Sequence, residues 1–278
     1  MSAALFAALL FGGSFLAGLL GSLTGLGGGM VIVPLLAIGF GVNLQYAIGA
    51  SLISVIATSS GAAAAYVREG YTNIRIGMFL EIATTVGALG GAFLAGMIST
   101  SAIAIVFAAV LLYSAWLSAR PRVEHVTQDL SDPLARSLRL NGTYPTPDGL
   151  QPYGVQRVAT GFSLMFVAGI LSGLLGIGSG AVKVLAMDNA MRLPFKVSTT
   201  TSNFMIGVTA AASAGVYLRR GYIDPVLSFP VMLGVLAGAL LGARILTRTH
   251  PKHLRLVFSV VIVALAIEMV YRAIQGTI

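Results

Sequence analysis

Most of this chain consists of apolar stretches long enough to cross a lipid bilayer as helices. A helix needs about 20 predominantly apolar residues to span the hydrocarbon core. Only 9% of the residues are charged and 56% are hydrophobic, whereas soluble domains have about 25% charged residues. The sequence therefore predicts an all-α polytopic membrane protein embedded in the lipid bilayer. The expected spans are Ser2–Leu23, Leu44–Val67, Ile74–Met97, Thr100–Ala119, Val158–Leu175, Val197–Leu218, Pro225–Leu246 and Leu254–Tyr271.

Two further apolar segments, Met30–Phe40 and Ala181–Met191, are too short to span comfortably alone. A polar stretch with Pro, Asp, Arg and turn signals, residues 120–157, divides the chain near its middle. We expect a first membrane repeat at residues 1–119, an extramembrane loop at 120–157 and a second membrane repeat at 158–278.

The two halves resemble each other at a constant shift of 151 positions. The shift aligns the Gly-rich segment 25–29 (Gly-Leu-Gly-Gly-Gly) with the segment 176–180 (Gly-Ile-Gly-Ser-Gly). It also aligns two copies of Tyr-x-Arg-x-Gly-Tyr, which begin at Tyr66 and Tyr217. We interpret this as a duplication in which each half has four long helices and one short broken or re-entrant helix.

The distribution of Arg and Lys favours an inverted arrangement of the halves. If each Gly-rich segment is the tip of a hairpin, the loops on one side hold 13 basic residues and those on the other hold three. In a parallel arrangement the division is ten against seven. The positive-inside rule prefers the first arrangement and places residues 120–157 in the cytoplasm. The same count fits hairpins that cross fully and hairpins that re-enter.

The Gly-rich segments are the first candidates for a binding site. A helix broken inside lipid exposes N–H groups that only protein or a water-filled cavity can satisfy. The short helices that follow would point their N-terminal N–H groups at a bound anion, and glycine lets the anion approach the backbone. The alternative is that these glycines allow close helix packing. The candidate binding residues are Gly25, Gly27, Gly28, Gly29, Gly176, Gly178, Ser179 and Gly180.

Polar side chains near these segments are further candidates. Lys183, three residues after Gly180, could hold an anion, or it could extend to the interface or pair with Asp188. Ser51, Ser202 and Asn203 could donate hydrogen bonds to an oxyanion, or they could serve contacts between helices.

Glu81 is a carboxylate that lies several residues inside the expected span Ile74–Met97. We expect it to lie near the interface and pair with Arg75, with proton coupling as the alternative.

Several function classes have no support in the sequence. There are no cysteines, the three histidines show no metal-ligand spacing, and we expect neither a metal nor a cofactor. No Walker loop or catalytic dyad is present, so we expect neither ATP hydrolysis nor an enzyme. The net charge of +8 lies in loops between the spans, which fits membrane topology rather than nucleic-acid binding.

The two copies of Gly-x-x-Gly/Ser-x-x-x-Gly-x-Gly-Gly/Ser-Gly resemble the TauE/SafE family of sulfite exporters. The copies are Gly18–Gly29 and Gly169–Gly180, with Ser172 replacing a glycine in the second, and Tyr-x-Arg-x-Gly follows each. The loop Arg136–Tyr153 is also similar to loops of bacterial members. The resemblance implies a multi-pass protein of the bacterial inner membrane that moves sulfite, organosulfonates or related small oxyanions.

We therefore expect a secondary transporter that binds a small anion between the two Gly-rich tips and works by alternating access. The driving force would be a coupling proton or sodium ion. The sequence leaves open an anion channel and, in a different class, an intramembrane enzyme or assembly factor. It does not define the oligomeric state.

Overall fold

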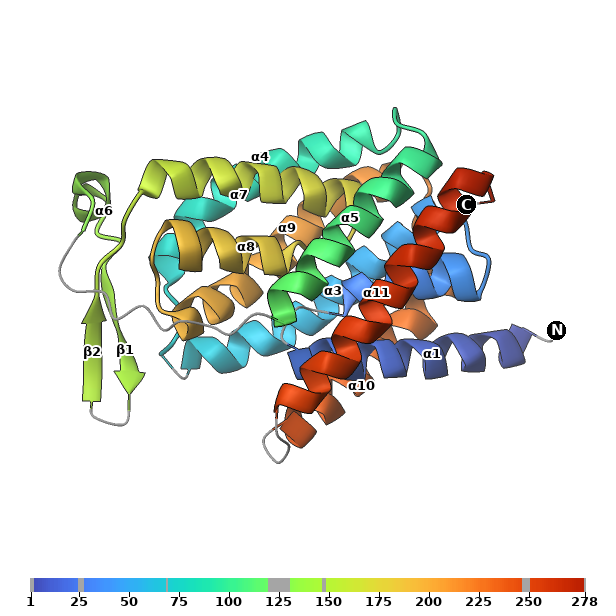
Figure 1. Ribbon diagram of the computed structural model, residues 1–278, viewed down its shortest axis with the longest axis horizontal. Helices are drawn as coiled ribbons and strands as arrows, with labels where there is room; N and C mark the ends of the chain where they lie inside the picture. The colour runs from blue at the N-terminus through green and yellow to red at the C-terminus, as the bar shows by residue number, and fades with distance from the viewer. Residues whose placement is uncertain are drawn as a thin grey trace.

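The computed structural model describes residues 3–24, 28–68, 70–119, 131–146, 149–246 and 251–277 (Figure 1). The first half comprises α1 (Ala3–Thr24), α2 (Gly29–Pro34) with the π-helical turn η1 (Leu35–Gly39), α3 (Leu44–Arg68), α4 (Ile74–Leu94) and α5 (Thr100–Ala119). The middle contains α6 (Pro133–Ser137), β1 (Gly142–Thr146) and β2 (Gly149–Tyr153). The second half comprises α7 (Val158–Leu175), α8 (Gly180–Leu185) with the π-helical turn η2 (Ala186–Ala190), α9 (Phe195–Arg219), α10 (Pro225–Leu246) and α11 (Pro251–Gln275).

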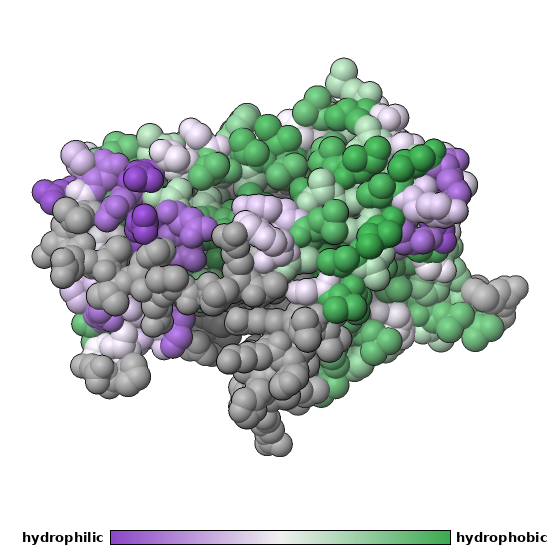
Figure 2. Space-filling view, in the orientation of Figure 1, coloured by the Kyte–Doolittle hydropathy of each residue, from purple (hydrophilic) through white to green (hydrophobic). Residues whose placement is uncertain are grey.

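The expected all-α membrane fold is confirmed. Four windows within the described helices are long and apolar enough to cross a bilayer by length and composition: Ala4–Gly21, Ile74–Leu94, Val158–Leu175 and Pro225–Gly242. Figure 2 shows apolar residues across the middle of the visible face and hydrophilic residues gathered at its two ends. Large apolar side chains such as Met78, Phe229 and Val260 are more than half exposed, which suits a lipid environment.

The helices of the two halves pack against each other. In Figure 1, α4 runs beside α7, and α1 packs against α10. Glycines bring these helices close: a Cβ added at Gly18 would lie 2.3 Å from the carbonyl oxygen of Val235, and one at Gly169 would lie 2.2 Å from that of Thr84. The two contacts are equivalent under the 151-residue shift. This is the pattern that a duplicated chain predicts, while the duplication and its inversion remain inferences.

The β-hairpin and α6 lie at the end of the molecule opposite both chain termini (Figure 1). Asn73, which caps α4 by accepting a hydrogen bond from the backbone N–H of Ile76 (3.0 Å), also fastens the hairpin. Its side-chain amide donates to the carbonyl oxygen of Leu140 (2.9 Å) and to the hydroxyl of Tyr153 (2.7 Å). Burial raises the pKa of Tyr153 to about 12, against the lowering effect of the Asn73 hydrogen bond, so its phenol stays neutral. The cytoplasmic position of this region remains a prediction.

Candidate functional site

The second Gly-rich segment connects α7 to α8 through a left-handed backbone. Gly176 and Gly178 have φ of +67° and +69°, and Ser179 has φ of +45°. Side chains rarely occupy this region, so glycine is the natural residue at the first two positions. The backbone N–H of Gly176 donates to the carbonyl oxygen of Ser172 (2.8 Å), which closes α7 before the break.

The first Gly-rich segment meets the second. Residues Gly25–Gly27 lie outside the described part of the chain, but Gly28 caps α2 and Gly29 begins it. A Cβ added at Gly29 would lie 3.2 Å from the Cα of Ile177. The hydroxyl of Ser51 in α3 donates to the carbonyl oxygen of Gly176 (2.8 Å). The described end of the first Gly-rich segment, Gly28–Gly29, therefore lies beside the second segment in the buried centre.

Aliphatic side chains close the described part of this junction. A Cβ added at Gly176 would lie 2.6 Å from Ile48, and one at Gly178 would lie 2.8 Å from Ile206. Val55 lies close to both Gly29 and Gly178. In this conformation these glycines face methyl groups rather than a hollow, as the packing alternative anticipated, so their role in binding an anion stays a prediction.

The hydroxyls of Ser51 and Ser202 donate to backbone carbonyl oxygens at the second helix break. Ser202 donates to the carbonyl oxygen of Gly180 (3.2 Å), as Ser51 does to Gly176. Asn203 is half-buried, and its side chain makes no hydrogen bond with the described residues. In this conformation the two serines therefore hold the broken helices, and a contact with substrate is not seen.

Ser179 differs from these serines. It is completely buried, and its hydroxyl has no hydrogen-bond partner among the described residues. Its left-handed backbone is a strained conformation for a residue with a side chain, and such strain occurs at binding sites and other functional positions. The backbone N–H of Lys183 donates to the carbonyl oxygen of Ser179 (3.0 Å), so this free hydroxyl lies one helical turn before the lysine.

Lys183 is completely buried, so it does not extend to the interface. Its ammonium group donates a hydrogen bond to the hydroxyl of Thr209 in α9, and not to Asp188. An ammonium group has three N–H donors, and the described residues provide an acceptor for one of them. The lysine thus has unused hydrogen-bonding capacity in an apolar interior, where a bare charge is costly.

Glu81 completes this polar cluster, and its expected pairing with Arg75 is wrong. The Glu81 side chain is 8% exposed, and its Oε1 accepts hydrogen bonds from the hydroxyls of Thr209 (2.6 Å) and Thr85 (3.1 Å). Arg75 instead donates to the carbonyl oxygen of Arg139 (3.4 Å). The reason is helix geometry: residues six positions apart differ by about 240° around the axis and face different sides.

Thr209 is the residue that the sequence interpretation missed. It lies between the two charges, since it accepts a hydrogen bond from Lys183 and donates to Glu81. The repeat offered one signal, because the 151-residue shift pairs Thr209 with Thr58. We call Glu81, Lys183 and Thr209 the polar triad. No group of three or more His, Asp or Glu side chains suitable for a metal ion occurs among the described residues.

Comparison with known proteins agrees with this architecture. The model of the family described as "Sulfite exporter TauE/SafE" matches residues 10–269. Two relatives from Bacillus subtilis are the "Probable membrane transporter protein YunE", 27% identical over 93% of this chain and 95% of its own, and the "Probable membrane transporter protein YdhB", 28% identical over 86% and 89%. A "Probable membrane transporter protein" of Xylella fastidiosa is 26% identical over 93% and 91%. No solved structure matches the chain.

Proposed function

Because this chain belongs to the TauE/SafE sulfite exporter family, we propose that it is a secondary transporter that moves a small anion across the bacterial inner membrane. The substrate class would be sulfite, an organosulfonate or a related oxyanion. The relatives' names support transport. The residues of the site support a negatively charged substrate.

The observation that carries the proposal is the buried Lys183. A cation deep in a membrane protein costs about 2.5–3.5 kcal/mol on insertion scales, and such residues commonly mark ion or substrate pathways. The unused N–H donors of Lys183 and the free hydroxyl of Ser179 can both donate to the oxygens of an anion. We place the substrate between these two groups, beside the Gly-rich junction.

The closure of the site supports alternating access. Lys183 and Ser179 have no exposed surface, so an anion reaches them only when the surrounding helices separate. A site that opens by such a movement fits a transporter, whereas a channel requires a continuous pathway. The two halves would then move around the site and expose it first to one side of the membrane and then to the other.

A binding screen with matched variants tests the proposal. Purified protein is heated in the presence of sulfite, thiosulfate, methanesulfonate or acetate, and the shift of the unfolding midpoint gives the affinity. Lys183→Met should weaken binding about ten- to hundred-fold, the equivalent of one charged hydrogen bond. Lys196→Met is the control, because Lys196 is exposed and stacks over the ring of Tyr71.

Counterflow in liposomes then separates the candidate mechanisms. A transporter exchanges labelled anion outside the liposome for unlabelled anion inside, and the rate of this exchange saturates as the anion concentration rises. A channel conducts an anion current that does not saturate in this way. Equal binding by Lys183→Met and wild type, with both monodisperse in gel filtration, would show that the lysine is not part of the site.

A further inference from the structure

The polar triad contains a carboxylate that anion binding alone does not require. Glu81 lies in the third turn of α4, and its Oε1 accepts the hydrogen bonds from Thr209 and Thr85. Its other oxygen, Oε2, is buried and has no hydrogen-bond partner among the described residues. A fully ionised carboxylate would normally engage both oxygens, so Glu81 has a vacant position where a proton can bind.

Lys183 is the positive charge that balances Glu81. In the described part of the chain, the two groups form no direct ion pair; each contacts the hydroxyl of Thr209. The elements packed against α4 are α7 and α9. Helix α7 has no titratable residue, and α9 has none between Lys196 and Tyr217. The other charge on α4, Arg75, is engaged with the backbone of Arg139.

A substrate anion at Lys183 would remove this balance. The single positive charge of the ammonium group would then face two negative charges in an apolar interior, the anion and Glu81. One of these two negative charges would be left without compensation. A buried charge without a partner is strongly unfavourable, and a carboxyl group relieves this by binding a proton. Oε2 of Glu81 is the position where that proton would be bound.

We infer that Glu81 binds a proton together with the anion, so that one proton and one monovalent anion cross the membrane in the same direction. The inference rests on the proposed anion site at Lys183. The proton comes from the aqueous side to which the site is open, and it leaves with the anion on the other side. No oxidant, metal or nucleotide is needed for this cycle.

Uptake driven by a pH gradient tests the inference. The full chain is placed in liposomes of phosphatidylethanolamine and phosphatidylglycerol, and uptake of labelled sulfite, thiosulfate and methanesulfonate is measured with and without an acidic exterior. Methanesulfonate stays ionised throughout, so its protonation in solution does not contribute. Wild-type protein should accumulate this anion about ten-fold for each pH unit of the gradient, as one proton per anion requires.

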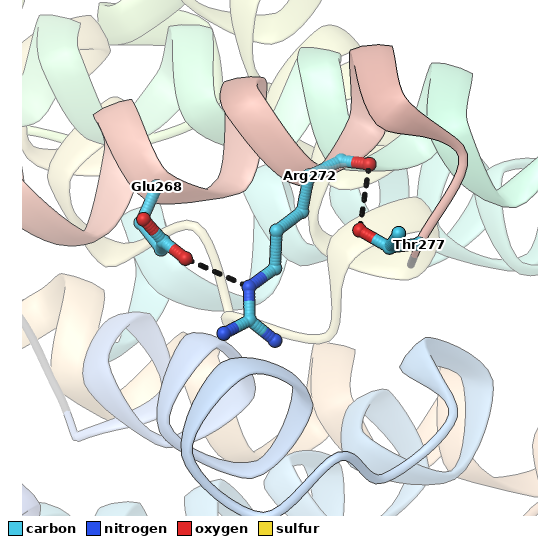
Figure 3. A network of polar contacts seen from close by, with 3 residues as sticks. All are labelled: Glu268, Arg272 and Thr277. Carbon is cyan, nitrogen blue, oxygen red and sulfur yellow. Dashed lines mark hydrogen bonds and ion pairs between the residues drawn. The ribbon is translucent and has the colours of Figure 1, made fainter.

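Glu81→Gln should lose accumulation driven by the pH gradient to a far greater degree than it loses exchange of anion for anion. The matched control is Glu268→Gln on α11. Glu268 is also a carboxylate in a helix, but its side chain is 42% exposed and pairs with Arg272 at 2.8 Å, as Figure 3 shows. The control should accumulate the anion as wild type does. Glu81→Asp, which keeps the carboxyl group, should retain part of the coupling.

The outcomes separate the inference from the proposed function. If wild-type vesicles exchange none of the three anions, the proposed function fails and the inference fails with it. If wild type exchanges an anion but a pH gradient drives no accumulation, or if Glu81→Gln accumulates it fully, only the inference is overturned. Should Glu81→Gln not fold, a pH dye with wild-type protein decides: one proton must enter with each methanesulfonate, and anion entry without proton entry refutes the coupling.

Discussion

Close backbone contact between the two halves predicts that adding one methyl group at Gly87 destabilises the protein. This glycine lies in α4, and a Cβ there would be 2.2 Å from the carbonyl oxygen of Phe166 in α7. Ordinary contact begins near 3.4 Å. Because the obstacle is backbone rather than a flexible side chain, the two helices would have to separate by about 1 Å, a gap that removes a quarter to a half of the attraction between packed atoms.

The expected loss of stability is the difference between two opposing contributions to the free energy of unfolding. Overpacking costs about 1–3 kcal/mol, and a rigid backbone obstacle places Gly87→Ala in the upper part of that range, at about 2–3 kcal/mol. Alanine gains about 1 kcal/mol over glycine in helix propensity. We expect Gly87→Ala to destabilise the protein by about 1–2 kcal/mol. Gly90→Ala is the control on the same helix, because nothing lies within 4 Å of a Cβ at Gly90, and it should gain about 0.5–1 kcal/mol.

Thermal unfolding in detergent measures the difference. A separation of about 1.5–3 kcal/mol corresponds to roughly 3–12 °C between the midpoints of the two variants. Gly238→Ala should behave like Gly87→Ala, since its Cβ would lie 2.0 Å from the carbonyl oxygen of Phe15, the equivalent contact 151 residues away. A midpoint for Gly87→Ala equal to that of Gly90→Ala would refute the claim that close backbone contact at this interface stabilises the fold.

Three other predictions concern the site and the topology. Thr209→Val should lower anion flux at least about ten-fold by removing the hydroxyl between the charges, whereas Thr209→Ser should preserve it; equal flux in both would exclude a bridging role. Gly178→Val should insert in the membrane but transport nothing, because its φ of +69° and the nearby Ile206 disfavour a side chain, and normal flux would make the break dispensable. A cysteine at Leu150, which is 71% exposed, should react with a membrane-impermeant maleimide in inverted vesicles and not in intact cells, and labelling of intact cells would reverse the predicted topology.

The sequence predicted the long helices well because membrane spans depend on local composition. The apolar run Val158–Leu175 coincides with α7. The run predicted to end at Met97 ends as a helix at Leu94, because the next residues form turns. The π-helical turns η1 and η2 were not predicted, since they have no local sequence signature that we recognise.

The site was harder to predict because its hydrogen bonds join distant segments. Thr209 and Glu81 are 128 residues apart, and a single sequence gives no information about that contact. The position of Glu81 was predictable in part, because its helical phase excludes a partner six residues earlier. Lys183 was recognised correctly as an unusual charge, but only the packing showed that Thr209, rather than Asp188, is its partner.

The polar triad is asymmetric in a way that bears on mechanism. The 151-residue shift relates Lys183, Thr209 and Glu81 to Ile32, Thr58 and Met232, so the equivalent position in the other half lacks both charges. There, Thr58 donates only to carbonyl oxygens of its own helix. The polar triad also joins the two halves, because Glu81 comes from the first half, and Lys183 and Thr209 come from the second. A movement of one half against the other would therefore break the Thr209–Glu81 hydrogen bond, so that the step that opens the site would also free the carboxylate to exchange its proton.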